Sequence, residues 1–110
     1  MSMSESSSTG EKYFVINTSG DSMLPTICSG DILTIDTSEM DYNIDDIVVF
    51  YTNESDGIKL VAHRITHIFS NKIIITKGDN NFRADKPIRP KKLIGKVVKI
   101  ERRQEKDESN

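Results

Sequence analysis

The sequence predicts an all-β domain, a small barrel or coiled sheet with at most one short helical turn. Its apolar residues gather in short segments rich in β-branched and aromatic side chains, and Gly, Asn and Ser residues separate these segments. Helical periodicity is nearly absent, so at most one turn of helix is expected, near 22–28 or 38–45. Several short strands with turn residues between them are typical of barrels and coiled sheets.

Three strands are expected in the first half of the chain. Segment 12–18, KYFVINT, is rich in the β-branched and aromatic residues that favour strands. Segment 31–37, DILTIDT, alternates apolar and polar residues and begins directly after the turn pair Ser29-Gly30. Segment 46–52, DIVVFYT, is a nearly continuous apolar run, which suits a strand buried on both faces.

Three more strands are expected in the second half. Segment 58–69, IKLVAHRITHIF, follows the pair Asp56-Gly57, a strong hairpin signal. Segment 72–76, KIIIT, follows a second tight connection, Ser-Asn, and segment 93–101, LIGKVVKIE, closes the region.

The length and composition predict one domain. A chain of 110 residues can bury one core and no second. Residues 1–11 are expected to form a disordered Ser-rich tail and 102–110 a charged disordered tail, which leaves 12–101 as the domain. The formal net charge is −2, which argues against general binding of nucleic acid, because that requires a basic surface. The single cysteine excludes an intrachain disulfide, and the apolar runs are far shorter than the roughly 20 residues that span a bilayer.

A polar segment at 20–26, GDSMLPT, interrupts the strands. It places Ser22 between a Gly and a Pro on an irregular, rigid turn. Such a turn can present a hydroxyl together with free backbone N–H groups, as acyl transfer requires. The same residues also suit an ordinary turn whose Ser and Asp cap a short helix, and composition alone favours this simpler interpretation.

Two further segments contain His and Asp. His63 is expected on one strand face with two apolar neighbours, where a histidine is most often a core residue but can also act as a general base. His67 is expected on the same face, roughly 13 Å further along, which is too far for both to ligate one metal ion, so no metal site is expected. Segment 77–85 is either an Asx-rich loop or the source of an acid that orients a catalytic imidazole.

Taken together and in this order, these segments resemble the catalytic domain of a type I signal peptidase, peptidase family S26. The resemblance covers residues 13–100. The Ser-Met-x-Pro motif also occurs in LexA-like peptidases, whereas the His-Arg and Lys-Gly-Asp-Asn-Asn motifs are similar to the archaeal and endoplasmic-reticulum branch, in which His replaces a Lys base. The matching motifs are GDSMLPT at 20–26 with SGD at 29–31, AHRI at 62–65, TKGDNN at 76–81 with Asp85, and IGKV at 94–97.

The resemblance implies a serine endopeptidase, with a coiled-sheet core of the signal peptidase and LexA-like type. It would cleave signal peptides or related precursors after a small residue, without metal or cofactor. Ser22 matches the nucleophile and His63 the general base. Asp79 and Asp85 match two acidic positions, and the resemblance leaves open which of them faces the imidazole.

The resemblance also implies an oxyanion hole and a substrate surface. The Ser22 amide would donate to the oxyanion. Gly20 stands where members of the family often have Ser, so Ser19 or another backbone N–H would supply the second donor. Met23 and Pro25 would contact the polypeptide substrate, which is expected to dock as an added strand against a sheet edge.

Members of the S26 family normally carry a transmembrane helix just before the serine strand, and only MSMSESSSTGEK precedes Tyr13 here. The chain is expected to be membrane-associated on the extracytoplasmic side, through a membrane surface or an anchoring subunit, or else cytoplasmic and soluble. Two alternatives stay open: a LexA-like peptidase that cleaves itself, and an inactive β-barrel binding module. Self-cleavage is disfavoured because LexA-like peptidases place Lys where His63 stands and cut at Ala-Gly or Cys-Gly, which this sequence lacks.

Overall fold

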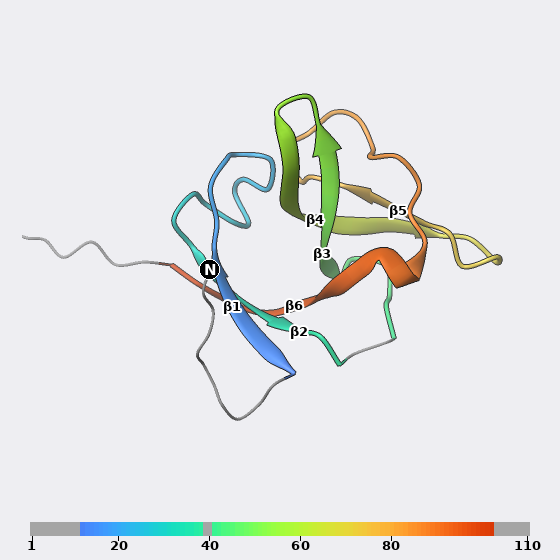
Figure 1. The fold of residues 1–110 in the computed structure, drawn as a ribbon, viewed down its shortest axis with the longest axis horizontal. Helices are drawn as coiled ribbons and strands as arrows, with labels where there is room; N and C mark the ends of the chain where they lie inside the picture. Colours follow the sequence, from blue (N-terminus) through green and yellow to red (C-terminus); the bar gives the residue numbers. More distant parts are fainter. Residues whose placement is uncertain (1–11, 39–40, 103–110) are drawn as a thin grey trace, which may run out of the picture.

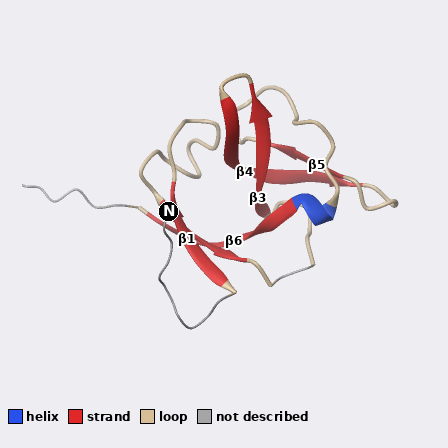
Figure 2. Cartoon of the chain, viewed as in Figure 1, coloured by secondary structure: helices blue, strands red, loops and turns tan. Residues whose placement is uncertain are grey.

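The computed structural model describes residues 12–38 and 41–102. Six antiparallel strands form one strongly coiled sheet in the order β1-β2-β6-β3-β4-β5 (Figure 1), and the fold is all-β, as the sequence predicts (Figure 2). The strands are β1 (Tyr13–Asn17), β2 (Ile32–Asp36), β3 (Ile47–Glu54), β4 (Gly57–Ile68), β5 (Ile74–Lys77) and β6 (Leu93–Glu101). These bounds agree with the expected segments to within two residues.

β4 belongs to two parts of the sheet. Its first half pairs with β3 in a hairpin, and its second half, from Arg64 to Ile68, also pairs with β5. In Figure 1 the hairpin stands almost perpendicular to the β5 end of the same strand. The corner of β4 therefore lies near Arg64, one residue after His63.

The helical content lies elsewhere than expected. The described residues contain one 3-10 turn, η1 (Pro90–Lys92), and it directly precedes β6. Proline favours the first position of such a turn because its fixed φ suits the helix and its missing N–H is not needed there. Residues 22–27 form a series of turns instead of a helix, and residues 39–40 lie outside the described residues. The single 3-10 turn of the described residues thus agrees with the expected upper limit of one short turn and lies outside 22–28 and 38–45.

The two histidines do not share a buried face. The register of β4 against β5 shifts between Ile65 and His67, which is a β-bulge, and a bulge interrupts the alternation of side chains along a strand. His63 and Ile65 are buried, whereas His67 is exposed and stacks on Phe69. The expectation that both histidines lie on one face was therefore wrong.

β3 is buried on both faces, as its apolar run predicts. Ile47 and Val49 enter one hydrophobic cluster, and Val48 and Phe50 enter another. The first cluster also holds two residues from the loop between β1 and β2. Its buried members are Met23, Ile27, Leu33, Ile35, Ile47 and Val49. The loop that carries Ser22 is thus packed against the core.

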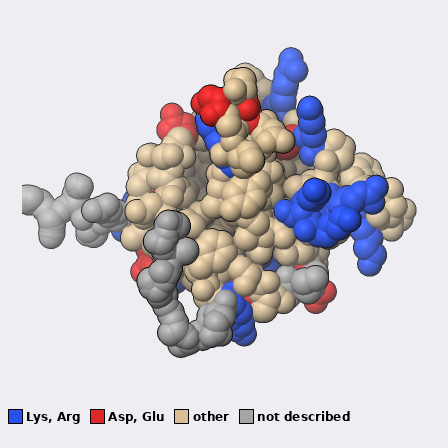
Figure 3. All heavy atoms as spheres, in the orientation of Figure 1, with Lys and Arg blue, Asp and Glu red and all other residues tan. Residues whose placement is uncertain are grey.

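Charge is distributed unevenly over the chain. Residues 70–92 contain seven Lys or Arg and two Asp, a net charge of +5, and the rest contains eight Lys or Arg and fifteen Asp or Glu, a net charge of −7. Basic side chains gather over η1 and its surroundings in Figure 3. The net charge of the whole chain is therefore close to zero although the surface beside η1 is basic.

Candidate active site

The Ser22 loop, residues 18–31, is closed at its base by backbone hydrogen bonds. The Thr18 amide donates to the Asp31 carbonyl at 3.0 Å, and the Gly30 amide donates to the Thr18 carbonyl at 2.8 Å. The Asp31 carboxylate, which is buried, accepts from the Cys28 amide at 2.8 Å and from Arg102 at 3.1 and 3.2 Å. These bonds hold the pKa of Asp31 below its ordinary value. Arg102 falls in the segment expected to be a disordered tail, but its hydrogen bonds to Asp31 stabilise this loop.

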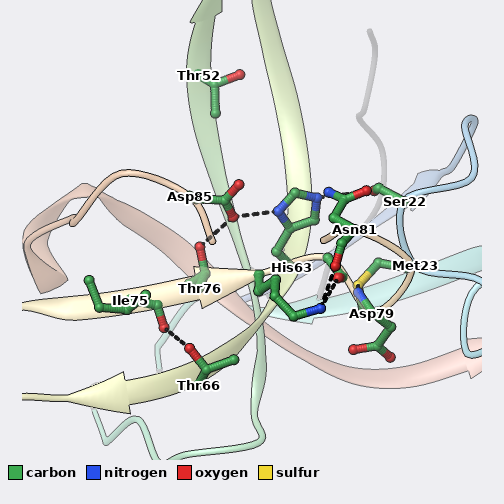
Figure 4. A network of polar contacts seen from close by, with 12 residues as sticks. Ser22, Met23, Thr52, His63, Thr66, Ile75, Thr76, Asp79, Asn81 and Asp85 are labelled. Carbon is green, nitrogen blue, oxygen red and sulfur yellow. Dashed lines mark hydrogen bonds and ion pairs between the residues drawn. The ribbon is translucent and has the colours of Figure 1, made fainter. Parts of the chain in front are cut away.

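Ser22 and His63 lie in direct contact. Ser22 Oγ is 3.0 Å from Nε2 of His63 (Figure 4). The two residues are 41 positions apart in sequence, and the coiling of the sheet brings them together. His63 is 7% exposed, and its ring meets Phe50 edge-on. The histidine is thus buried, with one ring nitrogen directed at the serine hydroxyl.

Asp85 lies on the other side of the imidazole. Its Oδ2 is 2.6 Å from Nδ1 of His63 and also accepts a hydrogen bond from Thr76 Oγ1 at 2.7 Å (Figure 4). Burial raises the pKa of Asp85, but the hydrogen bonds from His63 and Thr76, together with the charges of His63 and Lys77, lower it by more, so the group is a carboxylate at neutral pH. A carboxylate only accepts hydrogen bonds, so Nδ1 carries a proton and Nε2 is left to accept one from Ser22.

Asp79 does not contact His63. Its Oδ1 accepts from Nε of Arg64 and its Oδ2 from Nη2 of Arg64, each at 2.8 Å. Oδ2 also accepts from Thr26 Oγ1 at 2.6 Å. The hydrogen bond from Arg64 is the largest reason that the pKa of Asp79 lies below its ordinary value. Asp79 therefore ties the Ser22 loop to the residue that follows His63 on β4. Of the two acids that the sequence left open, the structure places Asp85 beside the imidazole.

A comparison with known families adds to this geometry. The family model described as Peptidase S24-like matches residues 1–98. The chain belongs to the Peptidase S24-like family. This family lies in the clan that LexA-like and signal peptidases share. No curated protein matches the chain. The match therefore supports a serine peptidase domain and does not distinguish the signal peptidase branch from the LexA-like one.

The S24-like domain has a cleft whose lining includes Ser22 and His63. Its volume is about 520 Å³. Residues 16–20, from β1 and the start of the Ser22 loop, line one side, and residues 59–63 of β4 line the other. Within the described residues, β1 pairs only with β2, and the first half of β4 pairs only with β3. Two strand edges with unpaired backbone groups therefore flank the cleft.

The remaining predicted site residues are distributed around this cleft. Ser19, Gly20 and Met23 line it, and Pro25 is exposed and is not among the lining residues. Gly20 has a φ of +94°, a value that favours glycine, and it turns the chain toward Ser22. The amides of Ser19 and Ser22 donate to no acceptor among the described residues. Both are available to a ligand in the cleft.

Thr76 and Thr26 were not assigned a role from the sequence. Each donates to one of the two acids, at 2.7 Å to Asp85 and 2.6 Å to Asp79. Both threonines stand inside the motifs quoted above, and their membership in those motifs was the only available signal.

In the part of the chain that the structure describes, no group of three or more His, Cys, Asp or Glu side chains could hold a metal ion. The described residues also form no helix long and apolar enough to cross a membrane.

Proposed function

We propose that this chain is a serine endopeptidase in which Ser22 is the nucleophile, His63 the general base and Asp85 the orienting acid. The observation that carries the proposal is the unbroken line of contacts from Ser22 Oγ through the imidazole to Asp85, at 3.0 and 2.6 Å. Nucleophile, base and orienting group within hydrogen-bond reach of one another are the arrangement that nucleophilic acyl transfer requires.

The proposed reaction runs in two halves. Ser22 Oγ attacks the scissile carbonyl carbon while His63 Nε2 takes its proton, and the Ser22 amide donates to the oxyanion that forms. His63 then gives the proton to the leaving amine, and an acyl-serine remains. A water molecule, deprotonated by His63, hydrolyses this ester and restores the serine. Throughout, the Asp85 carboxylate holds the Nδ1 proton and stabilises the imidazolium.

The substrate we propose is an extended polypeptide. The edges of β1 and β4 flank the cleft, and an added strand would satisfy their unpaired backbone groups. Close to Ser22 the cleft is lined by Met23, Ile27 and Ala62, which suit a small apolar side chain before the scissile bond. Cleavage of signal peptides or related precursors after a small residue agrees with this lining.

We favour cleavage of a separate polypeptide over self-cleavage. A histidine base is the feature that resembles the archaeal and endoplasmic-reticulum signal peptidases, and the sequence has no Ala-Gly or Cys-Gly bond of the kind that LexA-like peptidases cut in themselves. Incubating the purified chain and measuring its mass tests this choice. An intact mass is expected, and cleavage that proceeds at the same rate at any dilution would favour the self-cleaving alternative.

Labelling by a fluorophosphonate tests the nucleophile. Wild type should be labelled at Ser22, and Ser22→Ala and His63→Ala should both lose the label. Ser29→Ala is the matched control, because Ser29 is an exposed serine of the same loop. Loss of a nucleophile typically lowers activity by about 10⁴-fold or more. Peptide cleavage by Ser22→Ala above about one part in a hundred of wild type would overturn the assignment, and an unlabelled wild type would favour an inactive binding module.

A further inference from the structure

We propose that Asn80 is a positioning residue for the oxyanion hole, because it fixes the peptide planes on both sides of Ser22. This inference rests on the proposed function, since it concerns the oxyanion formed when Ser22 attacks. Asn80 itself does not touch the reacting atoms. It acts through the backbone of the Ser22 loop.

Asn80 binds two successive carbonyls of that loop. Its backbone amide donates to the Ser22 carbonyl at 2.7 Å, and its side-chain Nδ2 donates to the Asp21 carbonyl at 3.1 Å. One residue thus binds both the carbonyl before the nucleophile, which also accepts from the Leu24 amide at 3.1 Å, and the carbonyl of the nucleophile itself.

Because the peptide unit is planar, the hydrogen bond from Asn80 to the Asp21 carbonyl also fixes the direction of the Ser22 N–H. The Asp21 carbonyl and the Ser22 N–H belong to one peptide plane, and in a trans peptide they point in opposite directions. Holding the Asp21 carbonyl against Asn80 therefore directs the Ser22 N–H away from Asn80. That N–H donates to no acceptor among the described residues, so a preorganised donor is left for the oxyanion.

The loop that carries Asn80 is itself held close to Ser22. The Lys77 ammonium donates to the carbonyls of Gly78 and Asn81, at 3.0 and 2.6 Å, and the Asn81 amide donates back to the Gly78 carbonyl at 2.9 Å. A Cβ on Gly78 would lie 2.6 Å from the Ser22 carbonyl oxygen, closer than real Cβ atoms come to other atoms. Glycine at this position therefore allows the approach on which both Asn80 contacts depend.

The test compares Asn80→Ala and Asn80→Asp with wild type, and Asn53→Ala serves as a matched control in the exposed hairpin. Both variants of Asn80 lose the side-chain donor to the Asp21 carbonyl, which keeps the Leu24 amide, and both keep the backbone bond to Ser22. Removing an oxyanion donor costs about 10²- to 10³-fold in kcat, so loosening one should cost about 10- to 100-fold, with KM unchanged. Affinity for a peptide aldehyde, which forms a tetrahedral adduct with the serine, should fall by the same factor. Affinity for the product peptide should not change.

The ratio of these two affinities keeps the test decisive even where a variant is less stable, because partial unfolding weakens the binding of both ligands by the same factor. Equal loss of aldehyde and product affinity would overturn the inference and assign Asn80 a merely structural role. An active wild type with an equally active Asn80→Ala would also overturn it while leaving the proposed function intact. A wild type that is neither active nor labelled at Ser22 would overturn both.

Discussion

Asp85 meets His63 through a single oxygen, Oδ2, which lies 2.6 Å from Nδ1 of the imidazole. Thr76 donates to that same oxygen at 2.7 Å, so the carboxylate is held from a second side. The arrangement fixes both the orientation of the ring and the nitrogen that carries its proton. Substituting Asp85 and Asp79 one at a time should distinguish the role of this contact from the role of Asp79.

Asp85→Asn should abolish most activity with little loss of stability. The amide keeps the shape of the carboxylate but can donate to Nδ1, which favours the tautomer whose Nε2 carries the proton and cannot accept one from Ser22. We expect a fall of about 10³- to 10⁴-fold in kcat, with a thermal midpoint close to that of wild type. Measuring kcat and the midpoint on the same preparation checks this. Activity within tenfold of wild type would reduce the site to a Ser-His pair.

Asp79→Asn should have the opposite effect, a loss of stability with little direct loss of kcat. It replaces one of the two oxygens that accept from Arg64 with a donor and removes the negative charge, so the guanidinium, whose side chain is 28% exposed, keeps the Asp45 carbonyl but loses its ion pair. We expect the free energy of unfolding to fall by about 1–3 kcal/mol and kcat to fall only as far as the folded fraction does. Chemical denaturation and single-turnover kinetics measure the two effects. A large loss of kcat in a fully folded variant would mean that the two acids act together.

Asp79 should also make stability depend on pH. Arg64 holds the pKa of Asp79 below its ordinary value, while in the unfolded chain the carboxyl titrates near about 3.9. The unfolded state therefore binds the proton first as pH falls, so the stabilisation is complete above pH 4 and is lost as pH drops through the lower, folded pKa. Thermal midpoints of wild type and Asp79→Asn should differ at pH 6 and converge in acid. A difference that did not begin to shrink as pH falls below the ordinary pKa of an aspartate would contradict this explanation.

The sequence predicted the strands and their bounds better than it predicted the side-chain contacts. Alternation and turn residues define where strands begin and end, and these are local properties. The exposure of His67 depends on a bulge in the pairing with β5, and a bulge has no local pattern in β4 alone. The sequence motifs identified Ser22, His63 and two acids as candidate site residues. Which acid faces the imidazole depends on how the chain turns after Lys77, where Asp79 reaches back to Arg64 and Asp85 is carried to Thr76.

His63→Lys should not create a working serine-lysine pair. A lysine must be neutral to act as a base, and its ordinary pKa of about 10.4 has to be lowered by burial or by nearby cations. Here the side chain would meet the Asp85 carboxylate, which favours the charged ammonium, and a charged amine cannot accept the serine proton. We expect kcat/KM to fall by about 10³-fold or more at pH 7, since the base is lost.

The pH dependence of the same variant provides the decisive measurement. Wild type should reach its full kcat/KM at a lower pH than the lysine variant does, because its base is an imidazole and not an amine. The lysine variant should regain activity only at alkaline pH, and His63→Lys combined with Asp85→Asn should regain it at lower pH than His63→Lys alone, because the carboxylate that holds the charge is gone. A wild type whose activity rises only above about pH 9 would instead point to a lysine base, with Lys59 at the cleft or Lys77 as the candidates.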